Sequence, residues 1–206
     1  MSPGLPEPAA TAPAFLQCIV ELARAETNPV LLLLEGVTRL ERERRYPEGG
    51  LSLMDGHWRC FYHCHAAPEK PEEEHGHFHF FAACETEDAP AWTHVAALSM
   101  DHEGQPLRWF TVNRWVTDGP WVAAPALRAL LQWPDMGGEI ALLQRWLSLV
   151  VRFYAPAISH LLEQRDRMLT EIKPEAAQRT ILEDRQIYLL SARPVDVQAD
   201  LVAALA

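Results

Sequence analysis

The sequence predicts an α+β fold, in which a single domain has an antiparallel sheet of about four strands, within about residues 58–116, flanked by N-terminal and C-terminal helices. One reason is composition: the 206 residues are 49% hydrophobic and 22% charged, which is ordinary for one globular domain. The other is a change in hydrophobic period. Apolar residues recur at helical spacing near both ends of the chain and at every second residue between them.

The N-terminal part predicts a leader and two helices. Residues 1–13 are proline-rich and are expected to form a flexible leader, with the α+β domain occupying 14–206. Residues 13–26 have helical spacing, and Asn28 with Pro29 can begin a second helix, so a helical pair is expected up to about Arg44. The run RLERERR at 39–45 is interpreted as its solvated face. Residues 45–58 contain Pro and Gly and predict a loop.

Four segments alternate with a period of two and predict the strands, at 58–65, 75–84, 92–101 and 106–116. Their short connections favour an antiparallel meander, with a turn at 101–106 in which Gly104 can adopt a positive φ. Four helices are expected next. Two lie at 124–133 and 137–154, the third follows Pro156, and the fourth begins at about Pro174. An amphipathic tail at 196–206 ends the chain.

Charge and cysteine content exclude several classes of protein. A formal net charge of -10 argues against a nucleic-acid partner, which requires a basic surface. The four cysteines form no CxxC pair and no disulfide framework, so we expect a reducing cytoplasm. The longest apolar run is too short to span a membrane. Seven tryptophans and the amphipathic tail leave room for a homodimer face.

The most informative pattern is a ladder of five of the nine histidines. Alternate residues of a strand share a face, so His63 and His65 project together, as do His75, His77 and His79. An antiparallel hairpin would place His65 opposite His75 and His63 opposite His77. The other face of this hairpin is apolar and suits the core; it carries Cys60, Tyr62, Cys64, Gly76, Phe78 and Phe80.

Five imidazoles in facing registers predict a divalent-metal site, with zinc or iron as the expected ion. Glu74 lies at the mouth of the hairpin and could orient the rings, and His94 could join them if its strand is adjacent. Asn113 and Arg114 lie near a strand end, and Arg114 is a candidate for binding a substrate anion. Two simpler interpretations stay open, namely a polar, solvent-facing sheet surface and ordinary surface salt bridges.

The runs RRYPEGG, FYHCH, EHGHFHFF, LSMD, TVNRWVT and LEDR together resemble a bacterial domain family of unknown function. The resemblance extends from about Tyr46 to Arg185, and GGLSLMDGH departs from it, since an acidic residue is expected soon after the glycines. It implies membership but no established activity. The matching positions are His63, His65, Glu74, His75, His77, His79 and the segment Asn113 to Trp115.

Three functions fit these observations. The first is a metal-dependent enzyme, a hydrolase or an oxygenase, acting on a small-molecule substrate. The second is a non-catalytic metal-handling or sensor module. The third is a metal-free protein that binds a small molecule through its imidazoles.

Overall fold

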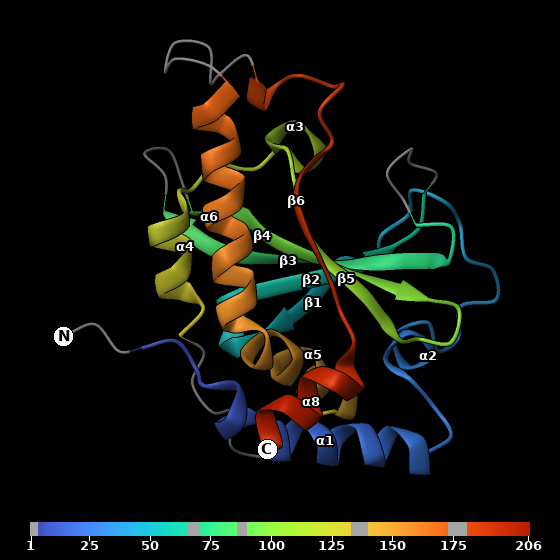
Figure 1. Ribbon diagram of the computed structural model, residues 1–206. Helices are drawn as coiled ribbons and strands as arrows, with labels where there is room; N and C mark the ends of the chain where they lie inside the picture. Colours follow the sequence, from blue (N-terminus) through green and yellow to red (C-terminus); the bar gives the residue numbers. More distant parts are fainter. Residues whose placement is uncertain (1–3, 66–70, 86–89, 133–139, 173–180) are drawn as a thin grey trace.

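The computed structural model describes residues 4–65, 71–85, 90–132, 140–172 and 181–206. Within these residues one antiparallel sheet has six strands in the order β1-β2-β3-β4-β5-β6 (Figure 1). They are β1 (Tyr46–Leu53), β2 (Trp58–His63), β3 (Glu74–Glu85), β4 (Pro90–Asp101), β5 (Pro106–Val112) and β6 (Leu189–Pro194). The α+β class is confirmed, and so are the four inner strands, except at two ends. The strand expected at 58–65 ends at His63, and the one expected at 106–116 ends at Val112, because Asn113 caps a short helix at Arg114–Thr117. The expected number of about four strands is wrong by the two edge strands.

Both missed strands lie at an edge of the sheet. Strand β1 occupies a segment that we expected to be a loop. The reason for that expectation was its content of Pro47, Gly49 and Gly50. Among the described strands β1 pairs with β2 alone, so a residue without an N–H is tolerated there. In the same described sheet β6 pairs with β5 and forms the other edge. It contains the buried Ser191, whose hydroxyl donates to the carbonyl of Leu161. Local pattern alone does not identify such short edge strands.

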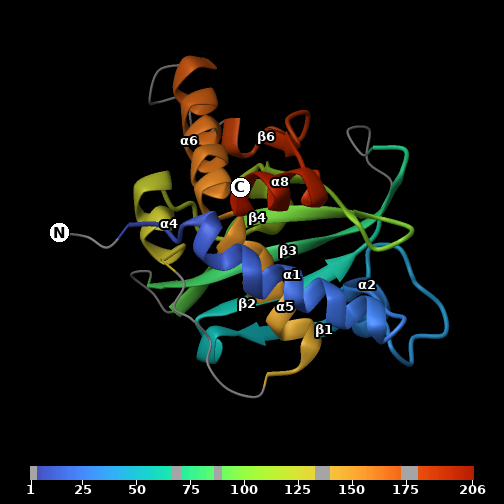
Figure 2. The same cartoon turned by 60° about the horizontal axis from the view of Figure 1, so that its bottom comes forward.

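The helices are α1 (Pro8–Arg24), α2 (Pro29–Leu33), α3 (Arg114–Thr117), α4 (Ala124–Leu130), α5 (Leu142–Phe153), α6 (Ala155–Ile172) and α8 (Val197–Leu205), and Met54–Gly56 forms a short 3-10 turn. Helices α1 and α5 lie across one face of the sheet (Figure 2). Phe15 of α1 contacts Trp146 of α5, which in turn contacts Phe78 of β3. The expected apolar face is therefore the core face, and it buries Cys60, Tyr62, Phe78 and Phe80.

The N-terminal helices differ from the expectation at both ends. Helix α1 begins at Pro8, inside the expected leader, with proline in its first turn. Helix α2 ends at Leu33, and residues 34–45 are not helical, so the helix expected up to about Arg44 is wrong. Alternating Glu and Arg add only a few tenths of a kcal/mol per pair, too little to hold a helix without an apolar stripe.

Two expectations about the second half of the chain are confirmed. Gly104 has a positive φ in the turn between β4 and β5, and the C-terminal tail contains a helix, α8. The start of the helix expected from about Pro174 falls on residues 173–180, which lie outside the described residues. In the parts of the chain that the structure describes, every helix is too short or too polar to cross a membrane.

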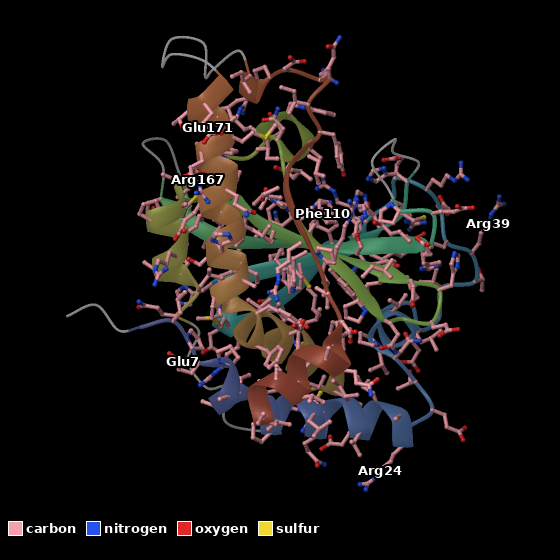
Figure 3. The ribbon with its side chains drawn as sticks, viewed as in Figure 1. Glu7, Arg24, Arg39, Phe110, Arg167 and Glu171 are labelled. Atoms are coloured by element: carbon pink, nitrogen blue, oxygen red, sulfur yellow. The ribbon has the colours of Figure 1, made fainter. Side chains whose placement is uncertain are left out.

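The opposite face of the sheet carries the histidines. Phe110 of β5, labelled in Figure 3, lies on the side of the sheet away from α1. It pairs with Ala97 of β4, which pairs with His79 of β3, so these three residues share one face. We call this surface the histidine face.

Candidate metal centre

The centre of the site is the expected pair of histidines. His63 of β2 is the register partner of His77 of β3, as the alternation predicted. Their Nε2 atoms lie 2.8 Å apart. The Nε2 atom of His79, two residues further along β3, lies 3.1 Å from that of His63. Three ring nitrogens from two adjacent strands therefore converge on one point.

His65 follows the end of β2. Together with His63, His77 and His79 it forms what we call the histidine group. One ligand atom from each of His63, His65 and His77 lies within 4.8 Å of the others. Tyr188 holds the His65 ring from outside, with 3.2 Å between its hydroxyl and Nε2. Tyr188 comes from the segment before β6, far away in sequence, and nothing in its local pattern indicated this contact.

Glu74 fixes the orientation of His77. The Nδ1–H of His77 donates to Oε1 of Glu74 at 2.7 Å, and the hydroxyl of Ser99 donates to Oε2 at 2.5 Å. Glu74 and His77 are only 3% and 2% exposed. Burial alone would raise the pKa of Glu74, but the bonds from His77 and Ser99 and the charge of Arg108 lower it. The carboxylate is thus held charged, and the Nε2 lone pair of His77 points to the centre.

His79 is held in a similar way by another histidine. Its Nδ1 lies 2.9 Å from Nε2 of His94, and the two rings are 2% and 8% exposed. A register shift between Phe80 and Phe81 places His94 opposite Phe81, on the histidine face. The condition set for His94 is therefore met, because its strand β4 is adjacent to β3, and its contact is with His79.

His75 does not join this group. A register shift between Glu74 and Gly76 makes His75 an extra residue in β3, and such a bulge re-aims the side chains around it. Its Nδ1 lies 2.7 Å from the Tyr62 hydroxyl, and its ring contacts that of His102. The expected pairing of His65 with His75 is not found, because the described pairing of β2 with β3 ends at His63 and His77.

Three rings, those of His63, His79 and His94, are held toward their uncharged form. Burial, followed by the charges of His77, His65 and Arg45, lowers the pKa of His63 to about 2. Burial, with the charges of Arg165 and His77, lowers the pKa of His94 to about 3. Burial also lowers the pKa of His79 well below its ordinary value. Neutral imidazole is the form that binds metals.

Two aromatic side chains contact the group. The Phe110 ring lies 5.3 Å from that of His77, and the Phe61 ring lies 5.6 Å from His63 and 5.4 Å from His79. His63 and His65 are half-buried, whereas His77 and His79 are buried. The group is therefore reached from solvent through His63 and His65.

Asn113 and Arg114 have structural contacts. The Asn113 side chain caps α3 and donates to the carbonyls of Ile181 and Ile187 at 2.7 and 3.0 Å. Arg114 forms an ion pair with Glu183. These contacts favour the simpler interpretation of both residues, as ties between β5 and the segment before β6.

The comparisons with known proteins add membership without a function. No curated protein matches the chain, and no solved structure matches it. The model of one family, described as a domain of unknown function, matches residues 9–195 and so includes every residue of the histidine group. The chain therefore belongs to the family DUF6969.

Proposed function

We propose that the histidine group binds one divalent transition-metal ion through His63, His65 and His77. The observation that carries this proposal is the convergence of their ligand atoms within 4.8 Å of one another. Zinc binds imidazole nitrogen at about 2.0–2.1 Å, which places two nitrogen ligands about 3.3 Å apart in a tetrahedral site. The three side chains therefore need only small rotations to close on an ion.

The number of protons and lone pairs on the converging ring nitrogens also supports a bound metal ion. A neutral imidazole nitrogen has either one proton or one lone pair, so Nε2 of His63 can form one good hydrogen bond. Two ring nitrogens approach it, at 2.8 and 3.1 Å. The Nε2 atoms of His63, His77 and His79 therefore cannot all be satisfied by one another, whereas a metal ion accepts lone pairs from several ring nitrogens.

The hydrogen bonds behind the rings also support it. Histidines that bind metals donate their other ring nitrogen to a carboxylate or a similar acceptor, which fixes the tautomer. His77 has this arrangement with Glu74, and His79 has an equivalent bond to His94. A merely polar sheet surface would not need two buried groups to orient its rings.

We infer zinc or iron as the ion, because sites rich in imidazole suit both. With three histidine ligands a coordination position stays open, and the bound ion would then supply Lewis acidity and an acidified water for hydrolysis. The alternative is a closed, non-catalytic site with His79 as the fourth ligand, which the 3.1 Å separation from His63 favours. We also infer a reducing compartment, in which the four cysteines would stay thiols.

The test is elemental analysis of untagged protein, together with zinc titration of the wild type and of His63→Ala and His77→Ala. We expect one equivalent of metal in the wild type and its loss in both variants, with the far-UV circular dichroism unchanged. His75→Ala is the matched control, since this ring belongs to the same sequence run but contacts Tyr62 instead. It should keep the metal.

Three other results would contradict parts of this proposal. Metal retained in both variants would exclude these ligands. A wild type that stays metal-free and shows no thermal shift with zinc, iron, manganese or nickel would favour the metal-free binding protein. If His79→Ala also loses the metal, the closed site is correct; if it keeps the metal, the open site is.

A further inference from the structure

Two arginines lie on the histidine face beside the proposed metal site. Arg59 belongs to β2, four residues before His63, and so points to the same side of the sheet. Arg45 immediately precedes β1, the strand that pairs with β2. They bring two positive charges to the outer side of the site, in a protein of net charge -10.

Aromatic rings join the arginines to the histidines. The Arg45 guanidinium carbon lies 4.7 Å above the Phe61 ring, and the Arg59 carbon lies 5.7 Å from the Phe81 ring and 4.7 Å from Trp92. Phe61 and Phe81 stack at 5.4 Å between centroids. Phe61 also contacts His63 and His79, so both guanidiniums stand on the aromatic row that borders the site.

Neither arginine forms an ion pair with an acidic residue in the described parts of the chain. Several other arginines do, among them Arg44 with Glu41 and Arg145 with Glu21. The Nε atom of Arg59 is buried and has no hydrogen-bond partner among the described atoms. The two guanidiniums lie over neighbouring stacked rings, Arg45 over Phe61 and Arg59 over Phe81. Burial, followed by the charge of Arg45, lowers the pKa of Arg59, as expected for two like charges on adjacent rings.

The donors available to a ligand are the terminal amino groups of the two guanidiniums, since the Nε atom of Arg59 is buried. An aromatic ring contacts the flat face of a guanidinium, whereas its N–H donors point outward in the plane and match the oxygens of a phosphate or carboxylate. Gly50 allows this position of Arg59, because a Cβ on Gly50 would lie 2.6 Å from Cγ of Arg59. The backbone of β1 thus leaves space for a long cationic side chain where a larger residue would displace it.

We propose that Arg45 and Arg59 form an anion subsite that holds the phosphate group of a small-molecule substrate next to the metal. This inference rests on the proposed metal-binding function, and it names the class of substrate, a phosphate monoester. Two neighbouring guanidiniums that repel each other are best balanced by a dianion, and a phosphate monoester carries about -1.5 to -2 charges at neutral pH. A single carboxylate would balance only one of them.

The test uses the full chain loaded with zinc and freed of excess metal by gel filtration. Inorganic phosphate is titrated by calorimetry into the wild type, Arg45→Gln and Arg59→Gln, with ionic strength held by sodium chloride. Each substitution should weaken phosphate binding about 10-fold or more, as expected for loss of a charge-assisted hydrogen bond. The zinc content should be the same in all three proteins.

Arg44→Gln is the matched control, because Arg44 is adjacent in sequence but pairs with Glu41. It should bind phosphate as the wild type does. Equal phosphate affinity in all variants, or no binding by zinc-loaded wild type, would overturn the subsite and leave the metal site intact. Acetate binding as tightly as phosphate would overturn the choice of a dianion.

The two proposals fail in different ways. If the wild type binds no zinc, the metal proposal is wrong, and the same phosphate titration is performed on the metal-free protein. Phosphate binding that depends on Arg45 and Arg59 but not on Arg44 would then support the anion subsite alone. Phosphate binding that ignores these arginines would overturn it.

Discussion

Replacing Glu74 tests the organisation of the site most directly. Glu74→Ala removes the acceptor of two buried hydrogen bonds, from Nδ1–H of His77 and from the hydroxyl of Ser99. Each buried donor that loses its acceptor costs about 1–3 kcal/mol, so the free energy of unfolding should fall by about 2–6 kcal/mol. Because the carboxylate also fixes the tautomer of His77, zinc affinity should fall by about 10- to 100-fold.

Glu74→Gln separates these two effects. The amide oxygen can still accept from His77, so the shape and tautomer are kept while the negative charge is lost. The hydroxyl of Ser99 can rotate to accept from the amide nitrogen. We therefore expect a loss of stability of about 1 kcal/mol, smaller than for alanine, with a measurable loss of zinc affinity.

Stability is measured by urea unfolding of the metal-free proteins, and zinc affinity by competition with a chromophoric chelator. Glu73→Ala is the control, because this neighbouring carboxylate is exposed and lies outside the group. It should match the wild type in both assays. If Glu74→Ala binds zinc as tightly as Glu73→Ala does, the carboxylate does not orient a ligand and the reasoning is refuted.

Three further substitutions test the surroundings of the site. In Gly76→Ala the new Cβ would lie 2.6 Å from the carbonyl oxygen of His63, so β2 and β3 must separate; thermal unfolding should report a loss of about 1–3 kcal/mol, with weaker zinc binding. Gly50→Ala, at φ 76°, should cost about 1 kcal/mol and displace Arg59, so calorimetry should find weaker phosphate binding at unchanged zinc content. Asn113→Ala loses a helix cap and three carbonyl contacts, two of them short, so urea unfolding should report a loss of about 2–4 kcal/mol without loss of zinc; wild-type stability would contradict the structural role.

Period-two alternation predicted much of the sheet, because the side-chain period of a strand is fixed by its backbone. It separated His63 and His77 from Tyr62 and Phe78 correctly, and the structure places these pairs on opposite faces. The burial of one face under helices also followed, since an apolar strand face must be covered.

Contacts between distant segments could not be predicted in this way. Tyr188 reaches His65, and Arg45 reaches Phe61, only because the edge strands β6 and β1 pair with their neighbours. Those two strands carry weak signals, since Pro47, Gly49 and Gly50 indicate a loop. Strand order and register determine such contacts, and neither is encoded in a short local pattern.

The remaining errors come from two bulges in the pairing of β3 with β4. Without the first, His75 would share a face with His77; with it, the Glu74 carboxylate reaches His77 and His75 contacts Tyr62. Without the second, His94 would lie opposite Ala82 on the core face; with it, His94 lies opposite Phe81 and reaches His79.

The alternation predicts five equivalent histidine rings. The first bulge replaces His75 by the carboxylate of Glu74, and the second adds the ring of His94 behind His79. Each exchange puts a hydrogen-bond partner behind a ring whose Nε2 faces the centre. A polar sheet surface has no need of such partners, but a metal site does, because its ligands must present a lone pair of fixed direction. The two departures from regular pairing are therefore the features that argue most strongly for a metal centre on this sheet.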